Sequence, residues 1–364
     1  MGQKTFIVIV FALLVTMIVS CAGPSPTPTL TSTPTPTSPT SVVTFFDPNL
    51  EATIRGAVNK PTGNITATDM APLTVLDAGE KGIADLTGIE YCVNLTGLYL
   101  YSNQITDIFP VASLTNLIEL DLSDNQITDI SPLEPLTNLV RLNLSDNQFK
   151  GFKIRDISPL EPLTNLTWLN LSFNQISDIS PLEPLTNLAT LNLSDNQIKE
   201  PPATQLDAES NISPLATLTN MTELSLSFNQ ISDISPLAPL TNLTTLYFFN
   251  NLISDIAPLA PLTNLTTLNL GDNQISDISP PAPLTNLVRL NLGDNQISDI
   301  SPLAPLTNLV RLNLDFNQIS DISPLLVNSG LSSGDRVYLR RNPLTTDSLN
   351  TDVPQLVKRG VDFR

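Results

Sequence analysis

A 22-residue repeat runs through most of the sequence and constrains the fold more than any other feature. The unit reads LxxLxLxxNxIxDISPLxPLTN, as in residues 287–308. Most neighbouring copies start 22 residues apart, and the copies begin at Leu73, Leu95, Leu117, Leu139, Leu166, Leu188, Met221, Leu243, Leu265, Leu287 and Leu309. Because one copy is too short to bury its own apolar side chains, such repeats stack into a solenoid with a continuous core.

The spacing inside the unit predicts the structure of each turn of the solenoid. Leu268 and Leu270 alternate with polar residues, which is the period of a half-buried strand, and stacked copies pair as a parallel sheet. The prolines of PLxPL exclude a long helix on the opposite side and favour short 3₁₀ turns. The sequence therefore predicts an α/β solenoid with a concave parallel sheet and convex 3₁₀ turns.

Two polar columns support this architecture. The asparagine at the ninth position, such as Asn273, is expected to satisfy backbone groups inside each turn. The aspartate before Ser-Pro, such as Asp277, is expected to cap the 3₁₀ turn with its side chain. Calcium binding is the alternative for the aspartates, but the sequence lacks the glycine-rich repeat that calcium-binding arrays use.

Both ends of the array are expected to carry a cap, because the terminal faces of a solenoid would otherwise expose its core. Residues 44–72 form the N-terminal cap, with a helix that begins after Asp47 and places Leu50, Ile54 and Val58 on one face. The repeats occupy residues 73–333. Residues 334–364 hold a degenerate last repeat, then a small helix and strand that cover the last turn.

The repeat resembles the leucine-rich repeat of bacterial internalins, in its 22-residue period, in its DISPL segment and in the helical cap that precedes it. The resemblance covers residues 45–364 and implies a rigid, exported scaffold that binds other molecules. Well-known internalins continue into an immunoglobulin-like domain and a cell-wall sorting signal. We find neither in this sequence, and we therefore do not expect an invasin role.

The first 43 residues predict an exported protein with a lipid anchor. Residues 1–20 have a basic start and a short apolar stretch, as in a signal peptide. The stretch ends at Ile18-Val19-Ser20-Cys21, which resembles the lipobox of bacterial lipoproteins. By that resemblance Cys21 becomes the lipid-modified N-terminus, held at the cell membrane or outer surface; an ordinary secretory peptide is the alternative. Residues 21–43, rich in Pro, Thr and Ser, form a tether.

Composition argues against enzymes and against nucleic-acid binding. The 17 basic and 35 acidic side chains give a formal charge of −18, which repels phosphate backbones. Histidine is absent, and the sequence has no nucleophile elbow, phosphate loop or metalloprotease motif. Cys92 aligns with a leucine column and is expected to be an inert core thiol. We expect neither enzymatic activity nor a cofactor or metal.

The residues expected to bind a partner are the outward-facing ones of each strand, at the third, fifth, seventh and eighth positions of the repeat. Exposed aromatic and arginine side chains on a rigid sheet are typical of interfaces. The candidates are Tyr99, Tyr101, Trp168, Phe173, Phe228, Tyr247, Phe249, Arg289, Arg311, Phe316 and Tyr338. We expect a monomer that binds a protein on its concave face; a glycan-binding module and a passive surface protein are the alternatives.

Two insertions interrupt the period. Five extra residues follow Gln148 and eleven follow Ile198, and both are expected to protrude at the same rim.

Overall fold

A computed structural model describes residues 41–147, 151, 153–199 and 211–364 of the chain. The predicted signal peptide, most of the tether and much of both insertions lie outside these residues. Among the residues described, no helix is both long enough and apolar enough to cross a membrane.

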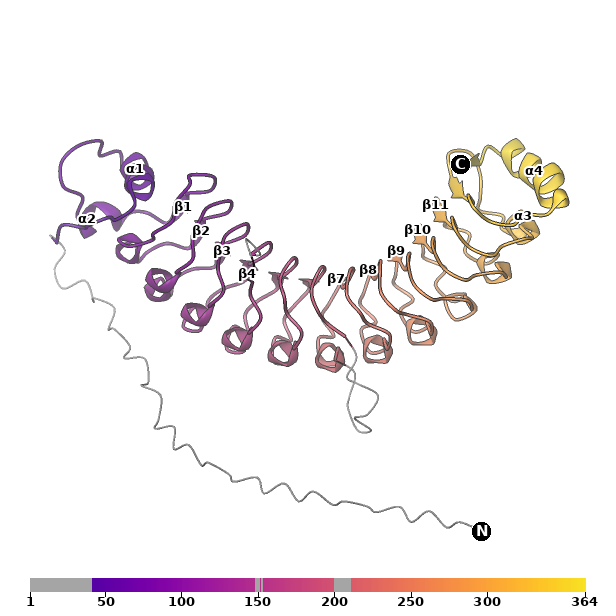
Figure 1. The fold of residues 1–364 in the computed structure, drawn as a ribbon, viewed down its shortest axis with the longest axis horizontal. Helices are drawn as coiled ribbons and strands as arrows, with labels where there is room; N and C mark the ends of the chain where they lie inside the picture. The colour runs from indigo at the N-terminus through magenta and orange to yellow at the C-terminus, as the bar shows by residue number, and fades with distance from the viewer. Residues whose placement is uncertain (1–40, 148–150, 152, 200–210) are drawn as a thin grey trace, which may run out of the picture. The chain divides into compact units, whose positions relative to one another are not determined.

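The described residues form a parallel sheet of 13 strands that follow one another in chain order. Figure 1 shows these strands along the inner side of the array and the short turns along its outer side. The strands are β1 (Val75–Asp77), β2 (Gly97–Tyr99), β3 (Glu119–Asp121), β4 (Arg141–Asn143), β5 (Trp168–Asn170), β6 (Thr190–Asn192), β7 (Glu223–Ser225), β8 (Thr245–Tyr247), β9 (Thr267–Asn269), β10 (Arg289–Asn291), β11 (Arg311–Asn313), β12 (Arg336–Tyr338) and β13 (Asp362–Phe363). The predicted solenoid is confirmed.

The register of the sheet places equivalent residues of neighbouring repeats side by side. Leu268 pairs with Leu246 on one side and with Leu290 on the other, and all three are buried. The leucine or isoleucine columns of every repeat join one apolar cluster. Cys92 is fully buried in this cluster, as predicted, and burial raises the pKa of its thiol to about 12.

The asparagine of the ninth position connects each repeat to the next by hydrogen bonds. Asn125 donates from Nδ2 to the carbonyl oxygens of Leu100 (2.9 Å), Leu122 (3.2 Å) and Ser123 (3.1 Å). Its Oδ1 accepts from the backbone N–H of Ile105 at 3.0 Å. The same pattern recurs along the column, which confirms the predicted role in satisfying buried backbone groups.

The outer side consists mainly of 3₁₀ turns, and in most repeats the predicted aspartate accepts a hydrogen bond from the backbone N–H at the start of the turn; η7, which follows Asn211, is an exception. Asp277 Oδ1 accepts from the backbone N–H of Ser279 at 2.8 Å, and Asp299 bonds Ser301 in the same way. The 3₁₀ turns are η1 (Ile89–Tyr91), η2 (Phe109–Ser113), η3 (Ser131–Leu133), η5 (Ser158–Leu160), η6 (Ser180–Leu182), η7 (Ser213–Thr217), η8 (Ser235–Leu237), η9 (Ala257–Leu259) and η10 (Ser301–Leu303). Residues 280–283, where Pro281 replaces leucine, form plain turns instead.

Helices cover both ends of the array, as predicted. At the start, α1 (Pro48–Ala57) is capped by Asp47 and buries Leu50 and Ile54, and the short α2 (Ala67–Met70) follows. At the other end the chain forms α3 (Ser323–Val327), a π-helical turn η11 (Ser348–Asp352) and α4 (Val353–Lys358). Strand β13 then pairs with β12.

Candidate binding face

The concave face is the surface formed by the first and third residues of strands β1 to β12, together with the turn residues at the seventh and eighth positions of each repeat. In each of these strands the middle residue is buried, while its two neighbours are less buried or exposed in nearly every case. Tyr99, Trp168, Tyr247, Tyr338, Arg289 and Arg311 all occupy these outward strand positions.

Three phenylalanines occupy the eighth position of their repeats, where the backbone is left-handed. We call Phe173, Phe228 and Phe316 the turn phenylalanines; their φ angles are 57°, 56° and 54°. Their side chains are 44%, 44% and 50% exposed. Except for Arg341, which follows Phe316, the neighbouring repeats place Asn or Asp at this position, residue types that tolerate the left-handed region far better than an aromatic does. Each turn phenylalanine therefore combines unfavourable backbone geometry with exposed apolar surface.

One of the turn phenylalanines belongs to an aromatic pair. The rings of Phe228 and Phe249 are 5.2 Å apart between centroids and meet edge to face, at an interplanar angle of 63°. Phe249 comes from the next repeat, at its seventh position, so the pair joins two adjacent turns of the solenoid. Such pairs add about 0.5–1.5 kcal/mol beyond the area that they bury.

A second cluster lies on strands β2 to β5. The guanidinium of Arg141 lies 4.7 Å from the ring centroid of Trp168, its partner on the adjacent strand. The Tyr99 hydroxyl donates to Glu119 Oε2 at 2.7 Å, and this hydrogen bond raises the pKa of Tyr99. These four side chains line a small hollow of about 140 Å³. The Arg141 guanidinium and the Trp168 ring therefore hold each other in place, as do the Tyr99 hydroxyl and the Glu119 carboxylate.

Tyr101 lies apart from these clusters. Its ring lies directly over the Cα of Gly79 in the preceding repeat, where a side chain of any size would collide with the ring. Tyr101 is half-buried, and packing against the solenoid explains its place without a partner.

A larger hollow of about 500 Å³ lies on the concave face between β8 and β12. We call it the C-terminal hollow; the side chains that line it include Tyr247, Asn269, Arg289, Asn291, Arg311, Asn313, Tyr338 and Arg340. It thus brings together Tyr247, Arg289, Arg311 and Tyr338, which the sequence analysis had selected separately.

Two glycines make room for asparagine side chains that line this hollow. Gly271 and Gly293 occupy the seventh position of two successive repeats, and a Cβ at either would lie 2.8 Å from the Nδ2 of Asn291 or Asn313. The asparagines use that space: Asn291 Nδ2 donates to Asn269 Oδ1 at 2.8 Å. The sequence signal for this arrangement is the replacement of serine by glycine at the seventh position of these repeats.

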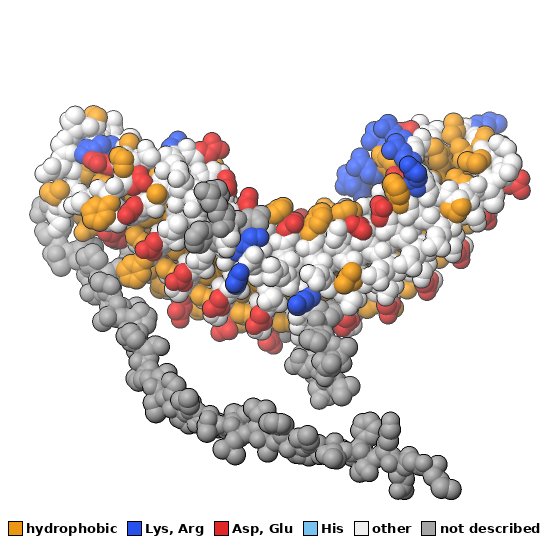
Figure 2. Space-filling view, viewed as in Figure 1, with side chains coloured by type: hydrophobic (Ala, Val, Ile, Leu, Met, Phe, Trp, Pro, Cys, Tyr) orange, Lys and Arg blue, Asp and Glu red, His pale blue; other side chains and the backbone are white. Residues whose placement is uncertain are grey.

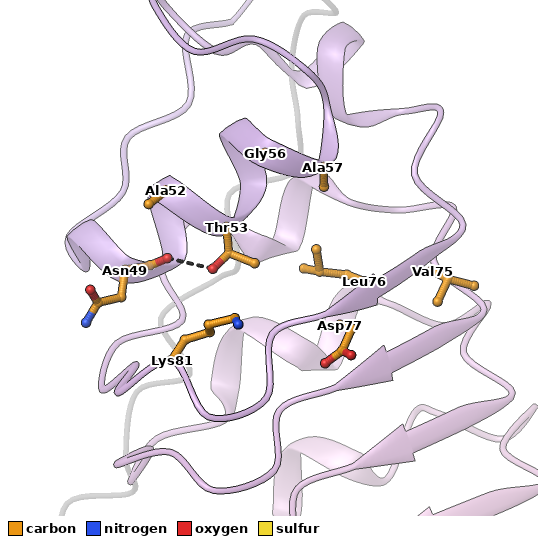
Figure 3. Close-up of a pocket in the computed structure, with 9 residues that line it drawn as sticks. All are labelled: Asn49, Ala52, Thr53, Gly56, Ala57, Val75, Leu76, Asp77 and Lys81. Atoms are coloured by element: carbon orange, nitrogen blue, oxygen red, sulfur yellow. Dashed lines mark hydrogen bonds between the residues drawn. The ribbon is translucent and has the colours of Figure 1, made fainter.

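The third hollow, of about 510 Å³, lies at the start of the array between α1 and β1. Figure 3 shows Thr53 and Ala57 of the helix directed toward the strand that holds Leu76, and Ala52 and Val75 also line the hollow. Thr53 bonds within its own helix, to the carbonyl oxygen of Asn49 at 2.8 Å. Neither an aromatic nor an arginine side chain lines this hollow, which therefore differs in chemistry from the concave face.

Comparison with known proteins agrees with the geometry. The family model "Leucine Rich repeats (2 copies)" matches residues 115–162, 164–207, 241–283 and 285–327, and a related single-repeat model matches residues 217–234. The crystal structure of an internalin, inlF, from Listeria monocytogenes is 35% identical, with a TM-score of 0.72. That alignment covers 88% of this chain and 95% of the inlF chain.

Two further proteins are similar over smaller regions. Internalin H of Listeria monocytogenes is 39% identical over 71 residues, which are 19% of this chain and 13% of Internalin H. The plant peptide hormone receptor RGFR1 is 23% identical with a TM-score of 0.60, over 76% of this chain and 49% of the receptor chain, and it shares the fold alone.

The parallel sheet, the asparagine column and the capped 3₁₀ turns define a leucine-rich repeat protein. Within that class, the chain belongs to the internalin family, as its similarity to inlF over almost the whole of that chain shows. Internalin-type repeat proteins are generally protein-interaction modules, and internalins are bacterial surface or secreted proteins.

Proposed function

We propose that this protein binds another protein through its concave face while a lipid at Cys21 holds it on the bacterial surface. The turn phenylalanines carry the proposal. An exposed phenylalanine in a left-handed turn is unfavourable both for the backbone and for hydration, and Asn or Asp fills the same place in neighbouring repeats. Binding energy from a partner that covers these rings offsets that disadvantage.

The remaining concave residues support the same proposal. Trp168 with Arg141, and Phe249 with Phe228, give two clusters in which aromatic and arginine side chains are already held by their neighbours. Residues of these types dominate the energy of protein interfaces, and prior ordering reduces the entropy lost on binding. The plant receptor with this fold was solved in complex with RGF2, so the fold accommodates a ligand in that protein.

The test replaces the turn phenylalanines by the residue type that neighbouring repeats use. The triple variant Phe173→Asn, Phe228→Asn, Phe316→Asn should keep or raise the melting temperature, because Asn tolerates the left-handed backbone. It should weaken the affinity for a protein partner, recovered by pull-down, by at least about 2 kcal/mol, the level that marks a hot spot. Phe109→Asn is the matched control, since Phe109 lies in η2 on the outer side and is 37% exposed.

The possible outcomes of this test distinguish the concave-face proposal from its alternatives. Equal loss of affinity in the triple variant and in the Phe109 control would place the binding surface elsewhere. A triple variant that loses much of its stability would assign the rings a structural role. Saturable binding of a purified glycan, without any protein partner, would favour the glycan-binding alternative, and the lack of any saturable ligand would favour a passive surface protein.

The anchor is tested separately. Cys21→Ser should abolish acyl labelling and release the protein from the membrane fraction. Unchanged partition of this variant with the membrane would refute the lipid anchor and leave the concave-face proposal untouched. On size-exclusion chromatography, the released protein should migrate as a monomer.

A further inference from the structure

Charge is distributed unevenly along the chain. Residues 289–364 contain eight of the 17 basic and eight of the 35 acidic side chains, so this segment has no formal net charge. Residues 1–288 therefore carry the entire formal charge of −18. Figure 2 shows Lys and Arg side chains gathered on the inner side near the C-terminal end, whereas Asp and Glu follow the outer edge.

Three of these arginines line the C-terminal hollow. Arg289 and Arg311 occupy paired positions on the adjacent strands β10 and β11, and Arg340 follows β12. All three side chains are exposed. Over the described part of the chain, none of them forms a salt bridge or a side-chain hydrogen bond. The backbones of these two paired arginines are separated by one strand spacing, about 4.8 Å, so their like charges repel each other.

Carboxylates border the hollow, but among the residues that the structure describes none of them forms a salt bridge with the three arginine side chains. Asp315 lines it and accepts a hydrogen bond from the backbone N–H of Arg340 at 2.6 Å. Asp272 accepts from the Asn250 side chain at 2.8 Å. Asp272 and Asp294 lie at the eighth position of their repeats, five residues beyond the third position that Arg289 occupies. Arg289 and Arg311 thus lie at the strand end opposite Asp272 and Asp294, whereas Arg340 lies beside Asp315.

The shape of the hollow limits what it accepts. It spans five strands, which is about 19 Å at about 4.8 Å for each strand spacing. An extended peptide of about six residues has that length. The floor adds amide groups that suit a peptide backbone, because Asn313 accepts from its own turn through Oδ1 while its Nδ2 has no partner within the described residues. Tyr247 and Tyr338 close the two ends.

We propose that the C-terminal hollow binds an acidic, extended peptide segment of a protein partner, with Arg289, Arg311 and Arg340 pairing with its carboxylates. The planar guanidinium forms two parallel hydrogen bonds with a carboxylate, and a paired carboxylate also relieves the repulsion between Arg289 and Arg311. This inference rests on the proposed protein-binding function and assigns a chemistry to one part of the partner.

The direct test measures binding of a labelled peptide to the purified protein by fluorescence anisotropy at about 0.15 M salt, where charges farther than about 8 Å are largely screened. The probes are a hexapeptide of glutamate, its glutamine counterpart and inorganic phosphate as a competitor. We expect saturable binding of the glutamate peptide, at least tenfold tighter than that of the glutamine peptide. Phosphate should compete only weakly, because it cannot occupy the whole length of the hollow.

Matched variants locate the binding. The double variant Arg289→Gln, Arg311→Gln should bind the glutamate peptide at least tenfold more weakly than the unaltered protein does, and its melting temperature should be unchanged. Arg155→Gln, which removes an exposed arginine outside the hollow, should leave peptide affinity within about twofold. Gly293→Val should also abolish peptide binding, because its side chain fills space now taken by Asn313. A circular dichroism spectrum of each variant checks that the fold is retained.

The outcomes separate this inference from the proposed function. Equal affinity for glutamate and glutamine peptides, or unchanged affinity in the Arg289/Arg311 variant, would overturn the inference. Complete competition by phosphate would identify a simple anion site and would overturn the peptide assignment. If the turn-phenylalanine variant still loses its protein partner in either case, the proposed function stands without the acidic segment.

Discussion

Replacing one asparagine of the ninth-position column should destabilise the solenoid by an amount that follows from its hydrogen bonds. In Asn125→Ala the backbone N–H of Ile105 loses its acceptor and stays buried without a partner. The carbonyl oxygens of Leu100, Leu122 and Ser123 each lose one donor. An orphaned buried N–H costs about 1–3 kcal/mol, which makes it the largest contribution.

The three carbonyl groups contribute less to the loss of stability, because each keeps a second hydrogen-bond donor. Leu100 still accepts from the Asn103 side chain, Leu122 from the Asn147 side chain, and Ser123 from the Ser102 N–H. At about 0.5 kcal/mol each, they bring the expected loss to about 2.5–4.5 kcal/mol.

Urea unfolding followed by circular dichroism measures the effect, and Asn116→Ala provides the matched control. Asn116 is exposed and donates a single hydrogen bond, to the Val93 carbonyl oxygen at 2.9 Å, so its loss should cost less than about 1 kcal/mol. Equal losses for the two variants would refute the reasoning, as would a loss below about 1 kcal/mol for Asn125→Ala.

Three further predictions concern the core, the thiol and pH. Leu268→Ala should lower the free energy of unfolding by about 2–5 kcal/mol, and Asn269→Ala by much less; similar losses in urea titrations would mean that the strand faces are misassigned. In a Cys21→Ser background, Cys92 should react with a thiol reagent at pH 8 only after unfolding, because its pKa is about 12 and it is buried; rapid native labelling would contradict this. The hydrogen bond from Lys60 lowers the Asp69 pKa from 3.8 to about 2, so Asp69 stabilises the fold above pH 3.8. This stabilisation declines between pH 3.8 and 2 and is lost as the pH falls below 2. The destabilising effect of Asp69→Asn should therefore be full at pH 7 and much smaller at pH 2; an undiminished effect at pH 2 would exclude the assigned pair.

The periodicity of the sequence was enough to predict the architecture, because every structural role recurs at a fixed place in the repeat. Leucine alternation placed Leu268 inside the sheet and Asn269 outside it. The Asp and Ser-Pro pattern predicted the capped turns, and the apolar face of residues 50–58 predicted the cap helix.

The arrangement of the candidate site was harder to predict from the sequence, because it depends on contacts between repeats. Nothing in the local sequence of Arg141 indicates that its guanidinium lies over Trp168, which is 27 residues away in the chain. The left-handed backbone at Phe228 follows from the turn geometry that all repeats share, and not from the phenylalanine itself. In the C-terminal hollow, the asparagines take the positions seen because glycines in the preceding repeats leave room for their side chains.

The central claim, that the concave face contacts the partner, is tested most directly by photo-crosslinking from single positions. A photoreactive phenylalanine analogue is placed at Thr190, between Trp168 and Glu223 on the sheet, or at Phe109 on the outer side. Irradiation of the complex with the recovered partner should give a covalent product from position 190 and none from position 109. A product from position 109 alone would contradict the account.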